Sequence, residues 1–257
     1  RRLRAVPGEL GEIDPAAAFE MKRERVFEYQ VFEESVCEVE KDDQPPKELS
    51  REAFEVALEI ALIFNARILD EVHVMRKTVV DGSSVSGFQR TALVAVNGFI
   101  ESSKGRMGIQ TISLEEESAG IVSQSEKKVV YRLDRQGIPL IEIATAPQIV
   151  NGEHAREVAE KIGLLLRSTG RVARGIGTIR QDLNTSIEGG ARIEVKGVQE
   201  LGLLSKIIEF ELNRQRELLA KGERVKPETR KAVGDRTEFM RPLPGAARMY
   251  PETDVPP

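Results

Sequence analysis

The sequence contains little of what disulfide-linked, zinc-binding and membrane-spanning proteins need. Its 257 residues include one cysteine, Cys37, two histidines and no tryptophan. A single cysteine can form neither an internal disulfide nor a cysteine-based zinc site, and no hydrophobic run approaches the length of a membrane span or a secretory signal. We therefore expect a cytoplasmic protein that does not bind a membrane.

Charge and motif content exclude further classes of protein. The 38 basic and 42 acidic residues leave a net charge of -4, which does not indicate a nucleic-acid coat or a membrane binder, although a local basic patch stays possible. The Gly-Lys-Ser/Thr ending of a Walker loop is absent. His73 and His154 have no serine or cysteine partner at a recognisable spacing, so a hydrolase triad is not supported.

What the sequence does contain is a series of strand-like segments interrupted by three amphipathic helices. Ser50 is expected to cap the first helix, whose buried stripe would include Ala57 and Leu62. Glycines at positions 170 and 222 would end the second helix, from about 152, and the third, from about 198. The strand candidates read RVFEYQVF, ESVCEVE, ALVAVNGFIE, MGIQTISLEEE and PLIEIAT. Strands outnumber helices and connections are short, which predicts an α+β fold around a mostly antiparallel sheet.

The segment IRQDLNTSIEGGARIEVKGVQEL, from Ile179 to Leu201, predicts a hairpin with one polar face. Residues on a strand alternate between its two faces, and a loop with an odd number of residues places the polar residues of both strands on one face and the apolar residues on the other. Such a loop would pair Asn184 with Glu194 and Asp182 with Lys196, and would leave the apolar residues on the core face. The polar face could line a catalytic site, or it could be an ordinary surface exposed to water.

Carboxylates gather on two other strand-like segments. Glu142 is a lone acid in the apolar run PLIEIAT, and residues 115–117 are three glutamates that close another strand. Because burying an unpartnered carboxylate is costly, we expect a cation beside Glu142. That cation could be Mg²⁺, which prefers oxygen ligands. An ion pair with Arg132 or Arg135 explains the same position equally well.

The polar loop DGSSVSGFQRT is a second candidate for phosphate binding. Ser83, Ser84 and Ser86 could hold a phosphate together with backbone N–H groups. An ordinary turn is the favoured interpretation, because serine and glycine are common in turns of every kind.

Several long motifs point to one family. The segments HVMRKTVVDGSSVSGFQRTALVA, YRLDRQGIPLIEIATAP, IRQDLNTSI, ARIEVKGVQEL and MRPLPGAARMYPETDVPP occur in this order. Together they resemble the GatB/GatE family of glutamyl-tRNA(Gln) amidotransferase subunits, and within it the archaeal E-type proteins. The resemblance covers nearly the whole chain. It implies a cradle-shaped catalytic domain, similar to glutamine synthetase, that uses ATP and Mg²⁺ to activate glutamate carried on tRNA(Gln).

The resemblance also implies site residues. Glu116 and Glu142 would bind Mg²⁺, and Asp182 and Asn184 would lie near the same site. The polar hairpin face itself adds Lys196 to the catalytic residues Glu116, Glu142 and Asp182. We expect ATP and substrate to be bound by Ser84, Ser86, Arg90, Arg180, Asn184 and Glu194. We expect Glu116 and Glu142 to approach one another across adjacent strands, and the polar hairpin face to line the same cradle.

Partners and boundaries follow from the same resemblance. An asparaginase-like amidotransferase partner of the D type would supply ammonia, Glu-tRNA(Gln) would be the substrate, and two D-type and two E-type subunits would assemble. Residues 1–222 would form the catalytic domain without its N-terminal strand, whose histidine also serves the metal in the family. Residues 223–257 would follow an insertion domain that this sequence lacks, so we expect a gap in space between residues 219 and 227. The alternative functions are a non-catalytic tRNA-binding or assembly scaffold and, third, a small-molecule kinase.

Overall fold

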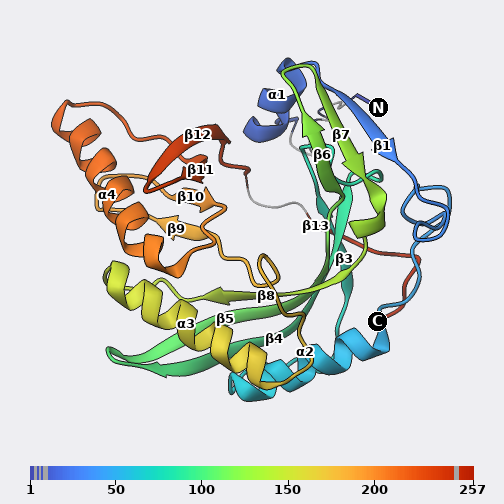
Figure 1. The fold of residues 1–257 in the computed structure, drawn as a ribbon, viewed down its shortest axis with the longest axis horizontal. Helices are drawn as coiled ribbons and strands as arrows, with labels where there is room; N and C mark the ends of the chain where they lie inside the picture. The colour runs from blue at the N-terminus through green and yellow to red at the C-terminus, as the bar shows by residue number, and fades with distance from the viewer. Residues whose placement is uncertain (3–4, 6, 8–10, 246–248) are drawn as a thin grey trace. The chain divides into compact units, whose positions relative to one another are not determined.

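The computed structural model describes residues 1, 2, 5, 7, 11–245 and 249–257, which form two compact units (Figure 1). The first unit consists of Arg1–Gly98, Ile109–Ala144 and Pro244–Pro257, and the second of Phe99–Gly108 and Thr145–Leu243. The expected α+β class with mostly antiparallel strands is confirmed. In the described part of the chain, no helix is both long enough and apolar enough to cross a membrane.

The first unit contains a three-stranded sheet and a larger sheet. Its elements are α1 (Pro15–Lys22), β1 (Val26–Gln30), α2 (Arg51–Ile63), β2 (Arg67–Ile68), β3 (Val74–Thr78), β4 (Phe88–Ser102), β5 (Gly105–Glu116), β6 (Gly120–Gln124), β7 (Lys128–Arg132), η1 (Leu133–Arg135), β8 (Pro139–Thr145) and β13 (Met249–Pro251). The small sheet has the order β1-β7-β6, with β1 parallel to β7. The larger sheet has the order β13-β3-β4-β5-β8, and β2 also pairs with β4. The tip of the β4–β5 hairpin and Thr145 belong to the second unit.

Helix α2 begins where the sequence predicts, but its buried stripe is rotated. The Ser50 side chain accepts a hydrogen bond from the Ala53 N–H at 3.3 Å, as expected of an N-cap. Ala57 is fully buried, whereas Leu62 is 66% exposed and Ile60 is buried instead. The expected stripe was wrong at Leu62, because several apolar residues compete on this helix and the sheet selects one face.

In the first fifty residues one predicted strand is wrong and one helix was missed. The segment ESVCEVE, residues 34–40, forms turns and not a strand, because its acids bond locally: the Glu40 carboxylate accepts from the Cys37 N–H at 2.7 Å. Helix α1 was not predicted. Its signal is present, since Asp14 caps the helix by accepting from the Ala16 N–H at 2.8 Å and Pro15 occupies the first turn.

The second unit packs two helices beside a four-stranded sheet. Its elements are α3 (Gly152–Ser168), β9 (Leu183–Thr185), β10 (Ile193–Lys196), η2 (Leu201–Leu203), α4 (Leu204–Ala220), β11 (Glu228–Val233) and β12 (Arg236–Pro242). The strand order is β12-β11-β10-β9, and β10 runs parallel to β11. Ile193, Val195, Leu204 and Ile207 form the centre of its core.

Helix α4 ends beside the predicted glycine. Gly222 has a φ of +74°, and the Glu223 N–H donates to the Leu218 carbonyl at 2.9 Å, which closes the helix end. Val225 is then buried in the core of the second unit. The expected gap in space between residues 219 and 227 stays a prediction.

The C-terminal segment divides between the two units. Residues 223–243 belong to the second unit and residues 244–257 to the first. Strand β13 lies against β3, with Pro251 opposite Met75 and Met249 opposite Lys77. The expected extended segment thus returns to the first unit, although its residues 246–248 lie outside the described part of the chain.

Candidate active site

Two carboxylates of the first unit converge on one lysine. The Nζ atom of Lys77 lies 2.6 Å from Glu115 Oε1 and 3.8 Å from Glu142 Oε2. Thr91 also donates its hydroxyl to Glu115 at 2.8 Å. We call Lys77, Glu115 and Glu142 the Lys77 cluster. Two carboxylates with a cation between them form a site whose oxygen atoms would also suit Mg²⁺.

Strand order brings the Lys77 cluster together. Lys77 lies on β3, Glu115 at the end of β5 and Glu142 on β8, which neighbours β5 in the sheet. Gln89 stands opposite Lys77 on the intervening strand β4, and its amide nitrogen donates to Glu115 at 3.3 Å. The buried Glu115 is therefore held by three donors, while the Glu142 side chain remains 55% exposed.

The structure places Glu116 elsewhere. Ala57 of α2 packs against Leu114, and Glu116 shares that face of β5 because alternate residues of a strand point to the same side. There Glu116 forms an ion pair with Arg90. The expected approach of Glu116 to Glu142 is therefore replaced by an approach of Glu115, since neighbouring residues on β5 point to opposite faces.

The exposure of Glu142 corrects the expectation that its carboxylate is buried. Its strand is only partly covered, so Glu142 is exposed and not a buried acid in need of a partner. Arg132 pairs with Asp134 and Arg135 with Glu117, whereas Lys77 is a cation that lies beside Glu142.

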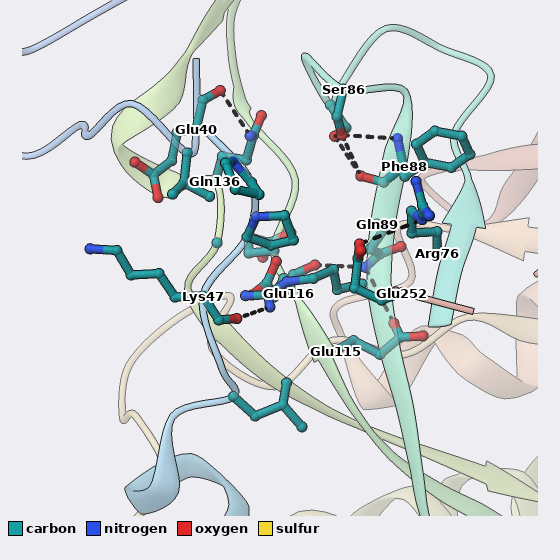
Figure 2. Close-up of a pocket in the computed structure, with 18 of the residues that line it drawn as sticks. Glu40, Lys47, Arg76, Ser86, Phe88, Gln89, Glu115, Glu116, Gln136 and Glu252 are labelled. Atoms are coloured by element: carbon teal, nitrogen blue, oxygen red, sulfur yellow. Dashed lines mark hydrogen bonds and ion pairs between the residues drawn. The ribbon is translucent and has the colours of Figure 1, made fainter. Parts of the chain in front are cut away.

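A cavity of about 780 Å³ adjoins Glu115 and Glu116 (Figure 2). The loop between residues 37 and 50 forms one wall, and the ends of β4 and β5 form another. Nine carboxylates line this cavity against three basic side chains, Lys47, Arg76 and Arg90. An anion such as ATP would need accompanying cations to enter such a lining.

The predicted serines line the cavity but also close their own loop. The Ser84 hydroxyl donates to the Phe88 carbonyl at 2.6 Å, and the Ser86 hydroxyl accepts from the Phe88 N–H at 3.2 Å. Ser83 bonds to Asp81 at 2.6 Å in the same way. These bonds are those of a stabilised turn, so the role of Ser84 and Ser86 in ATP binding stays a prediction.

Sequence reasoning missed Lys77, Arg76 and Glu252. The buried Glu252 follows β13, and its carboxylate lies 3.5 Å from Arg76 Nε (Figure 2). The guanidinium of Arg76 also lies 5.7 Å from the Phe88 ring centroid. The signal for Lys77 was its place in the strand-like run VMRKTVV. No local signal could have revealed Glu252, because its partner lies far away in the sequence.

The polar hairpin of the second unit has the predicted register. Asn184 pairs with Glu194, and Lys196 Nζ lies 3.1 Å from Asp182 Oδ2 and 3.4 Å from Glu194 Oε1. Gly189 occupies the left-handed position of the loop with a φ of +73°. We call Asp182, Asn184, Glu194 and Lys196 the mixed-charge face.

Neighbouring strands extend the mixed-charge face. Thr229 of β11 stands beside Glu194 and donates its hydroxyl to that carboxylate at 3.0 Å, and Arg241 of β12 pairs with Thr229. Burial alone would lower the pKa of Lys196, but the charges of Asp182 and Glu194 outweigh it and raise that pKa above the ordinary value. Lys196 is therefore a cation at neutral pH.

The predicted site residues thus fall into two groups. The first unit carries Ser84, Ser86, Arg90, Glu116 and Glu142, and the second carries Arg180, Asp182, Asn184, Glu194 and Lys196. Each unit also contains a lysine held by carboxylates, Lys77 in the first unit and Lys196 in the second. Such lysines can neutralise phosphate charge.

The histidines add no catalytic dyad in the described part of the chain. His154 lies 3.0 Å from the Ser102 hydroxyl, but its Nδ1 accepts from the Val150 N–H at 3.4 Å. In that tautomer Nε2 carries the proton and cannot remove one from Ser102. His73 precedes β3 and contacts Glu71 at 3.3 Å.

Comparisons with known proteins agree with the motifs. The model of the GatB/GatE catalytic domain matches residues 20–257. The chain is 57% identical over 219 residues to the E-type subunit of glutamyl-tRNA(Gln) amidotransferase from Pyrococcus abyssi, covering 85% of this chain and 35% of that protein. It is 52% identical over 226 residues to the protein of the same name from Archaeoglobus fulgidus, covering 88% of this chain and 37% of that protein. The chain thus spans about a third of the length of these relatives. From its match over residues 20–257, we conclude that the chain belongs to the GatB/GatE catalytic-domain family.

Proposed function

We propose that this chain is the catalytic part of a glutamyl-tRNA(Gln) amidotransferase, which converts Glu-tRNA(Gln) to Gln-tRNA(Gln) with ATP. An asparaginase-like partner of the D type would supply the ammonia, in an assembly of two D-type and two E-type subunits. The names of the relatives and the family match support the overall reaction. The observation that carries the ATP-dependent step is the Lys77 cluster, in which two carboxylates and an ammonium group converge.

The reaction would proceed in two displacements. The γ-carboxylate of the tRNA-borne glutamate attacks the γ-phosphorus of ATP, and ADP leaves. Ammonia then attacks the carbonyl carbon of the acyl phosphate, inorganic phosphate leaves, and the nitrogen loses a proton to give the amide. Phosphoryl transfer needs positioned cations more than covalent chemistry, so the protein contributes mainly orientation and charge.

The Lys77 cluster suits a metal-bound nucleotide. Mg²⁺ is commonly held by one or two carboxylates together with phosphate oxygens and water, and Glu115 and Glu142 supply two carboxylates. No group of three or more acidic, histidine or cysteine side chains among the described residues could hold a metal alone. When bound, Mg²⁺ would neutralise phosphate charge. Lys77 would donate to phosphate oxygens from its position beside both acids.

Lys196 would play a similar part on the mixed-charge face. Asp182 and Glu194 keep it charged and orient it, and its side chain is still 38% exposed, so it can reach a ligand. The face would therefore hold an anionic group of the substrate or nucleotide.

Turnover of ATP that depends on Glu-tRNA(Gln), measured with the assembled enzyme, tests the proposal. Glu142→Gln and Lys77→Met should each lower kcat by about 100-fold or more, because both remove charge that acts on the phosphoryl group. Glu101→Gln is the control, because the Glu101 side chain is 65% exposed and its ion pair in the described part of the chain is with Arg106. A parent enzyme that binds tRNA without any ATP turnover would contradict the proposal and favour the scaffold.

A further inference from the structure

A buried acid of the C-terminal segment faces one of the basic side chains that line the cavity of the first unit. The Glu252 side chain is only 4% exposed, and its Oε2 atom lies 3.5 Å from Nε of Arg76. Both residues line the cavity, on the side where Phe88 and Gln89 lie (Figure 2). Because a buried carboxylate is costly without a cation, Arg76 balances the charge of Glu252. Neither residue belongs to the Lys77 cluster or to the mixed-charge face.

Backbone pairing fixes the place of Glu252 independently of Arg76. Strand β13 runs antiparallel to β3 with Tyr250 opposite Arg76, and the Glu252 N–H donates to the Val74 carbonyl at 2.8 Å. The Asp254 N–H donates to Glu252 Oε1 at 3.2 Å and so directs the carboxylate. The carboxylate is therefore a fixed point against which the longer Arg76 side chain is oriented.

The Arg76 guanidinium is held on several sides and still keeps donors for a ligand. Nη2 donates to the Pro251 carbonyl at 3.3 Å, and the guanidinium carbon lies 5.7 Å from the Phe88 ring centroid. A guanidinium has five N–H donors, and Nη1 has no hydrogen-bond partner among the described residues. The side chain is 33% exposed, so a ligand can reach it. An arginine presented in this way suits phosphate oxygens.

The other basic side chains of the cavity are less suited to this role. Arg90, which stands opposite Arg76 on β4, forms an ion pair with Glu116 and donates to the Lys47 carbonyl. Lys47 itself is exposed on the loop. Arg76 is thus the basic residue of the cavity that combines a buried carboxylate partner with a donor left over for a ligand.

We propose that Glu252 is a positioning residue, which holds Arg76 so that its guanidinium binds a phosphate group of the nucleotide. This inference rests on the proposed function. The cavity lies where β4 begins and β5 ends, and Glu115 of the Lys77 cluster also lines it. Arg76 and Lys77 are neighbours on β3 and point to opposite faces, so they would bind different phosphates. With Lys77 acting on the transferred γ-phosphate, Arg76 would hold the α- or β-phosphate.

Steady-state ATP turnover by the assembled enzyme, with Glu-tRNA(Gln) at saturation, tests the inference. Glu252→Gln and Arg76→Met should each raise KM for ATP about tenfold, because a charged donor is lost or released from its position. The inhibition constant of ADP as a competitor of ATP should rise by a similar factor, since ADP keeps both phosphates that Arg76 would hold. KM for Glu-tRNA(Gln) should stay at the parent value.

The double variant Arg76→Met/Glu252→Gln shows whether Glu252 acts through Arg76. Its KM for ATP should equal that of Arg76→Met, because Glu252 has no effect once its partner is gone. The double variant also leaves no unpaired buried charge, so it keeps the test valid if a single variant does not fold. A double variant with the parent KM for ATP would overturn the inference.

Val255→Ala is the matched control for loosening of the C-terminal segment. Val255 is buried and follows Glu252 in the same segment, but it carries no charge. This variant should lower the free energy of unfolding and leave KM for ATP unchanged. A rise in KM for ATP as large as that in Glu252→Gln would make Glu252 an anchor of the segment alone and overturn the inference.

Two further outcomes separate this inference from the proposed function. A parent enzyme that turns over ATP, with a rise confined to KM for Glu-tRNA(Gln) in Arg76→Met, would make Arg76 a ligand of the other substrate and overturn the inference alone. Absence of ATP turnover in the parent would contradict the proposed function and the inference with it.

Discussion

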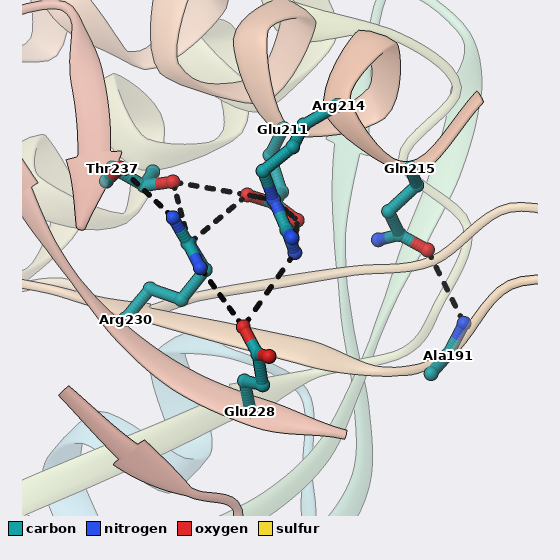
Figure 3. Close-up of polar contacts among 7 residues, drawn as sticks. All are labelled: Ala191, Glu211, Arg214, Gln215, Glu228, Arg230 and Thr237. Atoms are coloured by element: carbon teal, nitrogen blue, oxygen red, sulfur yellow. Dashed lines mark hydrogen bonds and ion pairs between the residues drawn. The ribbon is translucent and has the colours of Figure 1, made fainter. Parts of the chain in front are cut away.

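A buried ion-pair network in the second unit should make Glu211 essential for stability. Glu211 is fully buried on α4, with Arg214 Nη2 at 2.6 Å, Arg230 Nε at 3.5 Å and the Thr237 hydroxyl at 3.0 Å (Figure 3). Glu228 pairs with Arg230 at 2.8 Å and completes a set of two acids and two arginines. The network joins α4 to strands β11 and β12 of the sheet.

The substitution Glu211→Gln keeps the size of the side chain and removes its charge. Arg214 and Arg230 are only 19% and 10% exposed, so both would remain largely desolvated with a single acid to share. Breaking a buried ion pair on one side typically costs about 3–5 kcal/mol. For a chain of this length that loss corresponds to roughly 6–20 °C in Tm.

Urea denaturation of the parent and the variant measures the loss in the free energy of unfolding. The matched control is Glu238→Gln, which removes an acid that lies 3.0 Å from Lys231 across the β11–β12 hairpin. The Lys231 and Glu238 side chains are both more than half exposed, so loss of this ion pair should cost less than about 1 kcal/mol. If Glu211→Gln costs no more than the control, the network does not act as a buried charge balance and the reasoning is wrong.

Two further predictions concern a glycine and a lysine. Gly82 and Gly87 have φ values of +78° and +81°, but of these two only Gly82 would bring an added Cβ against a neighbour, the buried ring of Phe27 at 2.7 Å. Gly82→Ala should therefore lower the free energy of unfolding, measured by urea denaturation, by about 1–3 kcal/mol more than Gly87→Ala. Equal losses in the two variants would refute the contact. The pKa of Lys196 is raised in the folded state, so its contribution to stability is present below the unfolded-state pKa of 10.5 and is lost as the pH rises through the higher folded-state pKa. Asp182→Asn should lower the folded-state pKa of Lys196, measured by NMR titration, because it removes a paired charge. An unchanged pKa would contradict the pairing.

The sequence allowed the hairpin register and the helix ends to be predicted because both depend on local rules. Alternation of polar and apolar residues around Gly189 permitted only one register that kept Ile193 and Val195 inside. Gly170 and Gly222 ended their helices at positive φ. These features need no knowledge of distant contacts.

The choice between Glu115 and Glu116 could not be predicted, because it depends on which face of β5 α2 covers. Both acids follow Leu114 in the sequence, and alternation requires only that they point to opposite sides. The pairing of Glu252 with Arg76 was equally inaccessible, since β13 reaches β3 only after the chain has passed through the second unit. Tertiary packing decided both.

The binding of Mn²⁺ in place of Mg²⁺, followed by electron paramagnetic resonance in the presence of ATP, tests the proposed metal site most directly. Glu115→Gln and Glu142→Gln should each weaken Mn²⁺ binding by about 10-fold or more, because each removes an anionic ligand. Glu116→Gln should bind Mn²⁺ like the parent, since Glu116 pairs with Arg90 on the other face of β5. Loss of Mn²⁺ binding in Glu116→Gln, with binding kept in Glu115→Gln, would contradict the account.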